Sequence, residues 1–110
     1  MQQISGRELA DWLAESSRNE RPLPVMLDVR EPWEVEICRI DGAVALPMAA
    51  VPPRLGELDP DAETVVICHH GVRSFQVALF LERNGFSSVH NLAGGIDAWA
   101  HEVEPSMPTY

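Results

Sequence analysis

The chain has 110 residues, of which 45% are hydrophobic and 23% are charged. This composition is ordinary for a globular protein, and the length fits one domain, since chains usually divide at roughly 100–200 residues per domain. Eight basic residues, all of them arginine, stand against seventeen acidic residues, and the formal net charge is −9. Such a charge repels nucleic acid and anionic membranes, so neither is an expected partner.

Two cysteines, Cys38 and Cys68, are too few for a disulfide framework or for a zinc site with four thiolates. The first twenty residues mix both charge signs and lack the apolar core of a signal peptide. The longest apolar runs have about five residues, whereas a membrane-spanning helix needs about 20. We therefore expect a soluble, cytoplasmic protein with free thiols. Residues 1–110 form one domain in this interpretation, with a compact core at about 4–102.

In the first half of the chain, the pattern predicts a helix, a strand, a short helix and a second strand. Ser5 and Glu8 form a capping box, which begins the first helix. The almost wholly apolar run at 25–29 predicts a strand that is covered on both faces. Pro32 favours the first turn of a short helix that ends at about residue 37. Residues 43–46 predict the next strand, which Pro47 ends.

In the second half, prolines between residues 48 and 60 predict a helical turn and a loop. Residues 64–68 are apolar and mostly β-branched, and they give the strongest strand signal. The strongest helix signal lies at 74–83, where apolar side chains share one face and Asn84-Gly85 supplies the C-cap. The tail, residues 103–110, contains two prolines and is expected to be loosely held. The remaining predicted elements are a strand at 88–92 and a short helix at 96–102.

Alternation of strands and helices predicts an α/β fold with a parallel sheet and helices on both faces. Ligands of such sheets bind outside the carboxyl ends of the strands. Asp28, Arg30, Cys68, Gly94 and Gly95 all follow predicted strands. We therefore expect these residues to lie together at one edge of the sheet.

The stretch around Cys68 carries the chemistry. A cysteine at the end of a buried strand, followed by a tight loop and a helix, is placed to form a thiolate. Backbone N–H groups of the loop and the dipole of the helix both favour negative charge on the sulfur. Gly71 allows the loop to curl, and Arg73 and Ser74 offer a cation and a hydroxyl to an anionic substrate. Without this context, a cysteine that ends a strand is usually a small buried hydrophobic residue.

Four segments together resemble the rhodanese family of sulfurtransferases. Residues 27–34 resemble the first signature of the family, 42–47 its second segment, 66–74 its active-site loop, and 94–99 its closing signature. The four segments occur in the order that the family has, and they cover nearly the whole chain. The resemblance implies a single rhodanese-like domain with a five-stranded parallel sheet.

The resemblance also implies a persulfide mechanism. In it the Cys68 thiolate takes the outer sulfur of thiosulfate or of another persulfide. The sulfur then passes to cyanide or to a thiol, which can belong to a protein. The loop residues would hold the negative sulfur, and no metal or organic cofactor is needed. These loop residues are His69, His70, Gly71, Val72, Arg73 and Ser74.

Two other functions stay open. Phosphatase and arsenate-reductase relatives of this fold place the arginine six positions after the cysteine, but Arg73 lies five positions after Cys68. The shorter loop suits a sulfur atom better than a tetrahedral oxyanion. Non-catalytic interaction modules of the family commonly lack the cysteine, which is present here. Oligomeric state cannot be predicted from these patterns.

Several side chains have two interpretations. Asp28 and Arg30 either orient the site or form a structural ion pair, and Glu34 is expected to pair with an arginine. His69 and His70 either bind an anionic donor or face solvent. Histidines here in place of strongly basic residues argue against thiosulfate as the natural donor, a hypothesis that a micromolar KM for thiosulfate would contradict. Cys38 is either a resolving thiol or a packed side chain. Adjacent side chains rarely reach one metal ion, so Cys68, His69 and His70 form no expected metal site.

Overall fold

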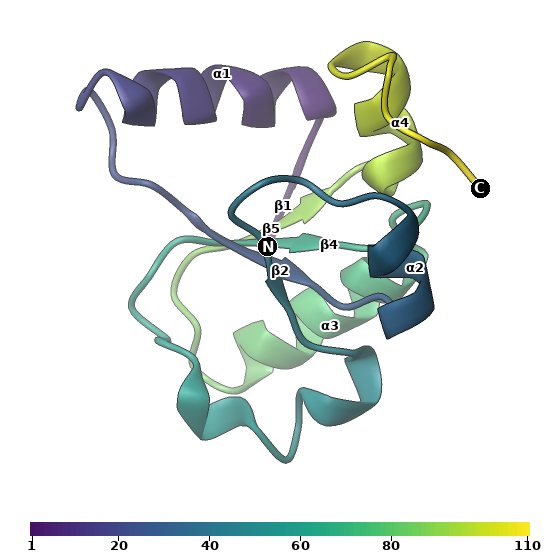
Figure 1. Ribbon diagram of the computed structural model, residues 1–110. Coiled ribbons are helices and arrows are strands. Elements are labelled where there is room, and N and C mark those ends of the chain that lie inside the picture. Colours follow the sequence, from purple (N-terminus) through teal and green to yellow (C-terminus); the bar gives the residue numbers. More distant parts are fainter.

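The computed structural model describes residues 1–110 and contains one five-stranded sheet, in the order β1-β5-β4-β2-β3. Every neighbouring pair of strands is parallel. Helices cover both faces, with α1 and α4 on one side and α3 on the other (Figure 1). The predicted α/β fold is confirmed. The strands are β1 (Gln2–Ile4), β2 (Val25–Asp28), β3 (Val44–Ala45), β4 (Thr64–Ile67) and β5 (Val89–Leu92).

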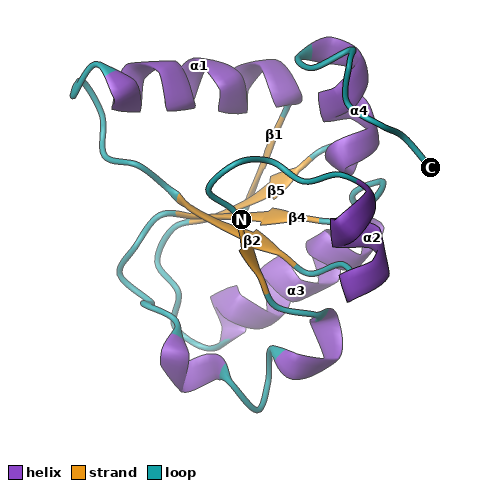
Figure 2. Ribbon diagram, in the orientation of Figure 1, coloured by secondary structure: helices purple, strands orange, loops and turns teal.

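Local sequence features explain where each of the four helices begins. In α1 (Gly6–Ser17) the capping box is present, since the Ser5 hydroxyl accepts from the Glu8 N–H and the Glu8 carboxylate accepts from the Ser5 N–H, both at 3.0 Å. Pro32 begins α2 (Pro32–Ile37). Glycines in the left-handed conformation precede α3 (Val72–Arg83) and α4 (Gly95–Glu102). Two 3₁₀ turns, Met48–Ala50 and Leu55–Glu57, occupy the proline-rich segment (Figure 2).

Two apolar cores lie on opposite faces of the sheet. One joins α1 and α4 to the sheet and includes Leu9, Trp12 and Trp99. The other joins α3 to the sheet and includes Val77 and Leu81. All four residues of the central strand β4 are buried, as the apolar run predicts. None of the helices is long and apolar enough to span a bilayer.

Two features differ from the sequence-based expectation. The edge strand β1 is missing from the local predictions, because three residues with two glutamines carry no strand pattern; its pairing partner β5 creates it.

The expectation of a loosely held tail is also wrong. Val103, Met107 and Tyr110 pack against the core on the α1 and α4 face. The Tyr110 hydroxyl also donates to Glu34 Oε2 at 2.7 Å. Aromatic and hydrogen-bond contacts thus hold the end of the tail.

Candidate active site

Cys68 directly follows β4, the central strand, and faces the start of α3. Its Sγ accepts a hydrogen bond from the Gly71 N–H at 3.0 Å and lies 3.2 Å from the Ser74 hydroxyl. Gly71 is the N-cap of α3, with φ of 97° and no side chain to cap the helix. The first N–H groups of a helix have no acceptor within it, so this end favours a negative charge. The expected thiol–loop–helix arrangement is therefore present.

The sulfur lies below the surface. Cys68 is only 1% exposed and belongs to the apolar core on the α3 face. Gly71 supplies the only backbone N–H that is hydrogen-bonded to Sγ, whereas the sequence suggested several. The surroundings of the sulfur are nevertheless polar on one side, because the Gly71 amide and the Ser74 hydroxyl both contact it. The group is buried among hydrogen-bonding partners, not sealed in apolar packing.

The first turn of α4 holds the loop in shape. The Ile96 N–H donates to the Cys68 carbonyl at 2.9 Å, and the Asp97 N–H donates to the His69 carbonyl at 3.1 Å. Gly95 lies so close that a Cβ atom there would be 2.6 Å from the Cys68 carbonyl oxygen, and nearer still to the His69 carbonyl. Gly95 of the closing signature thus allows the backbone of α4 to lie directly against the backbone of the loop.

Arg73 is paired with Glu34, an interaction that the sequence predicted for Glu34 without naming the partner. The guanidinium donates to both carboxylate oxygens of Glu34, at 2.6 and 2.8 Å. These hydrogen bonds hold the pKa of Glu34 at about 2, although burial opposes the shift. Because the carboxylate balances the Arg73 charge, the arginine faces the site as half of an ion pair.

Asp28 and Arg30 form a buried ion pair. The Arg30 guanidinium donates to both carboxylate oxygens of Asp28, at 2.9 and 2.7 Å. It also donates to the carbonyl oxygens of Glu34 and Cys38 and to the Tyr110 hydroxyl. Burial lowers the pKa of Arg30, but hydrogen bonds to Asp28 and Tyr110 outweigh it, and the net pKa is raised. This geometry matches the structural interpretation, in which the pair holds the chain after β2.

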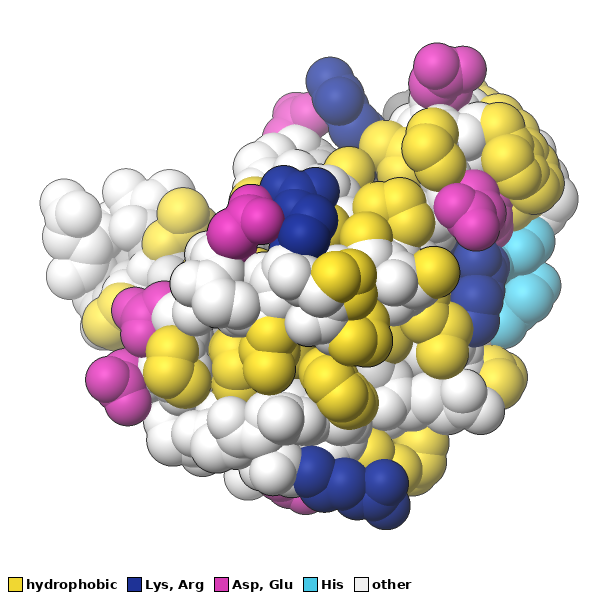
Figure 3. Space-filling view, turned by 90° about the horizontal axis from the view of Figure 1, so that it is seen from below, with side chains coloured by type: hydrophobic (Ala, Val, Ile, Leu, Met, Phe, Trp, Pro, Cys, Tyr) yellow, Lys and Arg dark blue, Asp and Glu magenta, His cyan; other side chains and the backbone are white.

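Three rings stack beside the loop. The Tyr110 ring lies 3.8 Å from the His69 ring, with 13° between their planes, and the His69 and His70 rings are 3.9 Å apart. His69 is half-buried and His70 is exposed, so only His70 faces solvent as one interpretation expected. Figure 3 shows histidine side chains at one edge of the molecule, next to a basic side chain. Tyr110 is therefore part of this site, although nothing in the sequence pointed to it.

Asn91 is a second residue that sequence reasoning missed. It lies in β5, is buried, and contacts both Ser74 and Gly71. The available signal was an asparagine inside a predicted strand, because a buried amide there needs hydrogen-bond partners.

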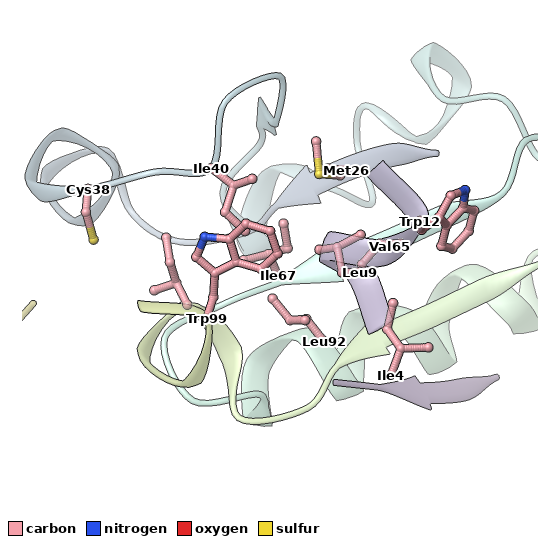
Figure 4. Close-up of a cluster of buried hydrophobic side chains, with 11 residues drawn as sticks. Ile4, Leu9, Trp12, Met26, Cys38, Ile40, Val65, Ile67, Leu92 and Trp99 are labelled. Carbon is pink, nitrogen blue, oxygen red and sulfur yellow. The ribbon is translucent and has the colours of Figure 1, made fainter. Parts of the chain in front are cut away.

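Cys38 lies away from this site. It packs in the core on the α1 and α4 face, where Figure 4 shows it in one cluster with Ile40 and Trp99. Cys68 belongs to the core on the other face. Both cysteines are free thiols. No group of three or more His, Cys, Asp or Glu side chains lies close enough to bind one metal ion.

Comparison with known proteins assigns the family. The family model of the Rhodanese-like domain matches residues 9–102 of this chain. A sulfurtransferase from Allochromatium vinosum is 38% identical over 81 residues, which are 74% of this chain and 76% of that protein. The probable adenylyltransferase/sulfurtransferase MoeZ of Mycobacterium tuberculosis is 38% identical over 97% of this chain.

The chain spans only 26% of MoeZ, and 30% of another curated relative. Among solved structures, the crystal structure of a rhodanese-like domain protein from Staphylococcus aureus has a TM-score of 0.82 and 31% sequence identity. That similarity covers 94% of this chain and 95% of the solved one. The sequence, the fold and the Cys68 loop therefore agree, and the chain belongs to the rhodanese-like domain family.

Proposed function

We propose that the protein is a sulfurtransferase in which Cys68 carries a sulfane sulfur as a persulfide. The single observation that supports this most is the position of Cys68 Sγ, between the Gly71 N–H and the Ser74 hydroxyl, where α3 begins. Hydrogen-bond donors and a helix N-terminus stabilise a thiolate, which is the nucleophilic form of cysteine.

The reaction has two displacements without net oxidation. The Cys68 thiolate attacks the outer sulfur of thiosulfate, a new S–S bond forms, and sulfite leaves with the electron pair of the broken bond. An acceptor then attacks the outer sulfur of the persulfide. Cyanide leaves as thiocyanate, whereas a thiolate leaves as a new persulfide, and Cys68 is again a thiolate. Protein side chains supply each step, so the proposed reaction uses no metal or organic cofactor.

The burial of the Cys68 sulfur favours a sulfur donor whose reactive end is narrow. Because Cys68 is 1% exposed, the atom that it attacks has to be at the end of a narrow group. The outer sulfur of thiosulfate and the terminal sulfur of a persulfide both meet this condition. A phosphate ester presents its phosphorus inside a tetrahedron of oxygens and is a poorer fit.

The rim of the site favours a protein as the acceptor. Val72 and Phe75, in the first turn of α3, are 68% and 38% exposed, and Trp33 is 59% exposed. Trp33 also contacts Tyr110, whose ring stacks on His69. Exposed apolar side chains next to a reactive group are typical of a surface that meets another protein. The name of another relative, the putative sulfur carrier protein YrkF of Bacillus subtilis, fits a protein as the sulfur acceptor.

The burial of Cys68 also supports a second function, a non-catalytic interaction module in which the cysteine is a core residue. Incubation with thiosulfate, followed by intact mass measurement, separates the two. Sulfur transfer predicts a gain of about 32 Da, the mass of one sulfur atom. The gain disappears in Cys68→Ser and persists in the matched control Cys38→Ala.

Addition of cyanide then removes the added sulfur and releases thiocyanate. A protein that shows no mass gain with thiosulfate or with a small organic persulfide is an interaction module, and the proposal fails. A gain that persists in Cys68→Ser overturns the assignment of the nucleophile.

A further inference from the structure

Asn91 stands out as a buried amide in the middle of the sheet. It is 2% exposed, and its backbone pairs with Val66 on one side and Gln3 on the other. Its side chain reaches the candidate active site, where it contacts Ser74 and the Gly71 carbonyl. A buried amide at this position would be costly without partners, and every polar atom of this one has them.

The orientation of the Asn91 amide is fixed by its neighbours. The Nδ2 group donates to the Gly71 carbonyl at 3.1 Å and to Gln3 Oε1 at 2.9 Å. A carbonyl oxygen can only accept, so the atom that faces Gly71 has to be the nitrogen. The amide oxygen, Oδ1, is therefore the atom that faces Ser74, and it accepts the Ser74 hydroxyl proton.

Ser74 has one hydroxyl proton and two neighbours that can accept it. Its Oγ contacts Asn91 Oδ1 and also lies 3.2 Å from Cys68 Sγ. While Cys68 is a thiol, its S–H can donate to Ser74, and Ser74 donates to Asn91. When Cys68 loses its proton, the best donor for the negative sulfur is the same Ser74 hydroxyl. Turning that proton to the sulfur leaves Asn91 Oδ1 buried without a donor.

We propose that Asn91 is a positioning residue that acts through Ser74 on the ionisation of Cys68. It competes with the sulfur for the Ser74 proton and so favours the thiol over the thiolate. Through its bond to the Gly71 carbonyl it also holds the residue whose N–H contacts the sulfur. The relevance of this control to catalysis rests on the proposed function, but the control itself is a property of the thiol.

Other charged and titratable groups also face the loop. From α3 and α2 these are the Arg73–Glu34 pair, and within the loop they are His69 and His70. From α4, Asp97 lies 4.0 Å from His70, and the Tyr110 ring covers His69. None of these residues changes in the experiment below, so their effect cancels when two variants are compared with each other.

The test is a double-mutant cycle on the ionisation of Cys68. In a Cys38→Ala background, Cys68 is the only thiol, and its thiolate is followed by ultraviolet absorbance as the pH rises. Carbamidomethylation by iodoacetamide, measured as a rate against pH, gives a second reading. The midpoint of each curve is compared for the background, Asn91→Leu, Ser74→Ala and the double variant.

The expected result is a coupling between the two positions. Asn91→Leu removes the competing acceptor and should lower the midpoint of Cys68 ionisation when Ser74 is present. Relative to the shift that Asn91→Leu causes in the Ser74→Ala background, this shift should be about 0.7 pH unit further downward. That difference corresponds to one hydrogen bond of about 1 kcal/mol. Asn91→Ala replaces the leucine variant if the latter does not fold. An equal effect of Asn91→Leu in both backgrounds overturns the proposal.

Two further variants sharpen the result. Asn91→Asp keeps the acceptor that faces Ser74, so its midpoint should be equal to or above that of the background; a lower midpoint contradicts the proposal. Thr64→Val removes a buried hydroxyl at the opposite end of β4 and should leave the midpoint unchanged. A shift there would show that any buried polar change moves it, which also overturns the proposal. Because these readings need no sulfur donor, their failure is distinct from absence of sulfur transfer.

Discussion

The two cysteines have similar burial but very different surroundings. Cys38 is 9% exposed and Cys68 is 1% exposed. Cys38 lines a surface cavity together with Val35, Glu36 and Arg39, whereas Cys68 lines none of the cavities of the protein. Access alone would therefore favour Cys38 as the reactive thiol.

Hydrogen bonding favours Cys68. The hydrogen-bond partner of Cys38 Sγ is the Arg30 guanidinium at 4.0 Å, and that group is already bound to Asp28. Cys68 Sγ has the Gly71 N–H and the Ser74 hydroxyl within 3.2 Å. Burial therefore does not separate the two thiols, whereas the hydrogen-bond partners of the sulfur do. These partners are the basis on which we propose Cys68 as the nucleophile.

The largest expected effect comes from Gly95→Ala, which disturbs the backbone packing around Cys68 and not that around Cys38. The added methyl group meets the backbone of Cys68 and His69, and the φ of +62° is strained for alanine. We expect a loss of about 3 kcal/mol in the free energy of unfolding, measured by urea denaturation. We also expect loss of the mass gain with thiosulfate.

Gly56→Ala is the matched control for this prediction. Gly56 is exposed, and nothing lies within 4 Å of an added Cβ atom there. Its free energy of unfolding should stay within about 0.5 kcal/mol of the parent protein. If Gly95→Ala were as stable as Gly56→Ala, the close contact between α4 and the loop would not support the site.

A middle-sized effect is expected from Glu34→Gln, which disturbs the surroundings of Cys68. The Glu34 carboxylate accepts hydrogen bonds from Arg73, next to the Cys68 loop, and from the Tyr110 hydroxyl. We expect a loss of about 2 kcal/mol in the free energy of unfolding at pH 7, since the guanidinium of Arg73 is left without its carboxylate.

The pH dependence of the free energy of unfolding shows whether the Glu34 carboxylate causes this loss of stability. The pKa of Glu34 is lowered from 4.5 to about 2, mainly by hydrogen bonds from Arg73. Its contribution is complete above pH 4.5 and is lost as the pH falls toward 2. The parent protein should therefore lose more stability than Glu34→Gln across this window. Parallel curves for the two proteins would assign the loss to other groups.

The smallest effect concerns Tyr110, which links the two regions by contacting Arg30 and His69. Burial raises the pKa of Tyr110 from 10 to about 12. Because a raised pKa favours the protonated folded state, this contribution is complete below pH 10 and is lost as the pH rises toward 12. Tyr110 is the only tyrosine, so tyrosinate absorbance reports it alone. A midpoint near 10 in the folded protein would show that the ring is free of the site.

Local patterns predicted most of the fold. The capping box at Ser5, the apolar run of β4 and the proline that begins α2 all depend on neighbouring residues. The strand β1 and the held tail depend on distant partners, β5 for the strand and Glu34 for Tyr110. No local pattern carries that information, so the sequence missed both.

The candidate site also contains some residues that local sequence places and others that distant partners place. Short-range backbone requirements place Cys68 at the end of β4 and Gly71 at the start of α3, and the local sequence predicted both positions. Asn91 and Tyr110 contact loop residues that are 17 or more positions away along the chain, and only the folded chain brings them there. Arg73 lies at the end of the loop, but its pairing with Glu34 across 39 positions was not specified by the sequence.

The contact between α4 and the Cys68 loop has a consequence for evolution and engineering. Carbonyl groups of Cys68 and His69 and amides of Ile96 and Asp97 make this contact, so main-chain atoms alone maintain the course of the loop there. The side chains of His70 and Val72 are exposed and take no part in these main-chain hydrogen bonds. These two positions are free to diversify, and reprogramming the choice of donor or acceptor can start with them while the frame around the sulfur stays intact.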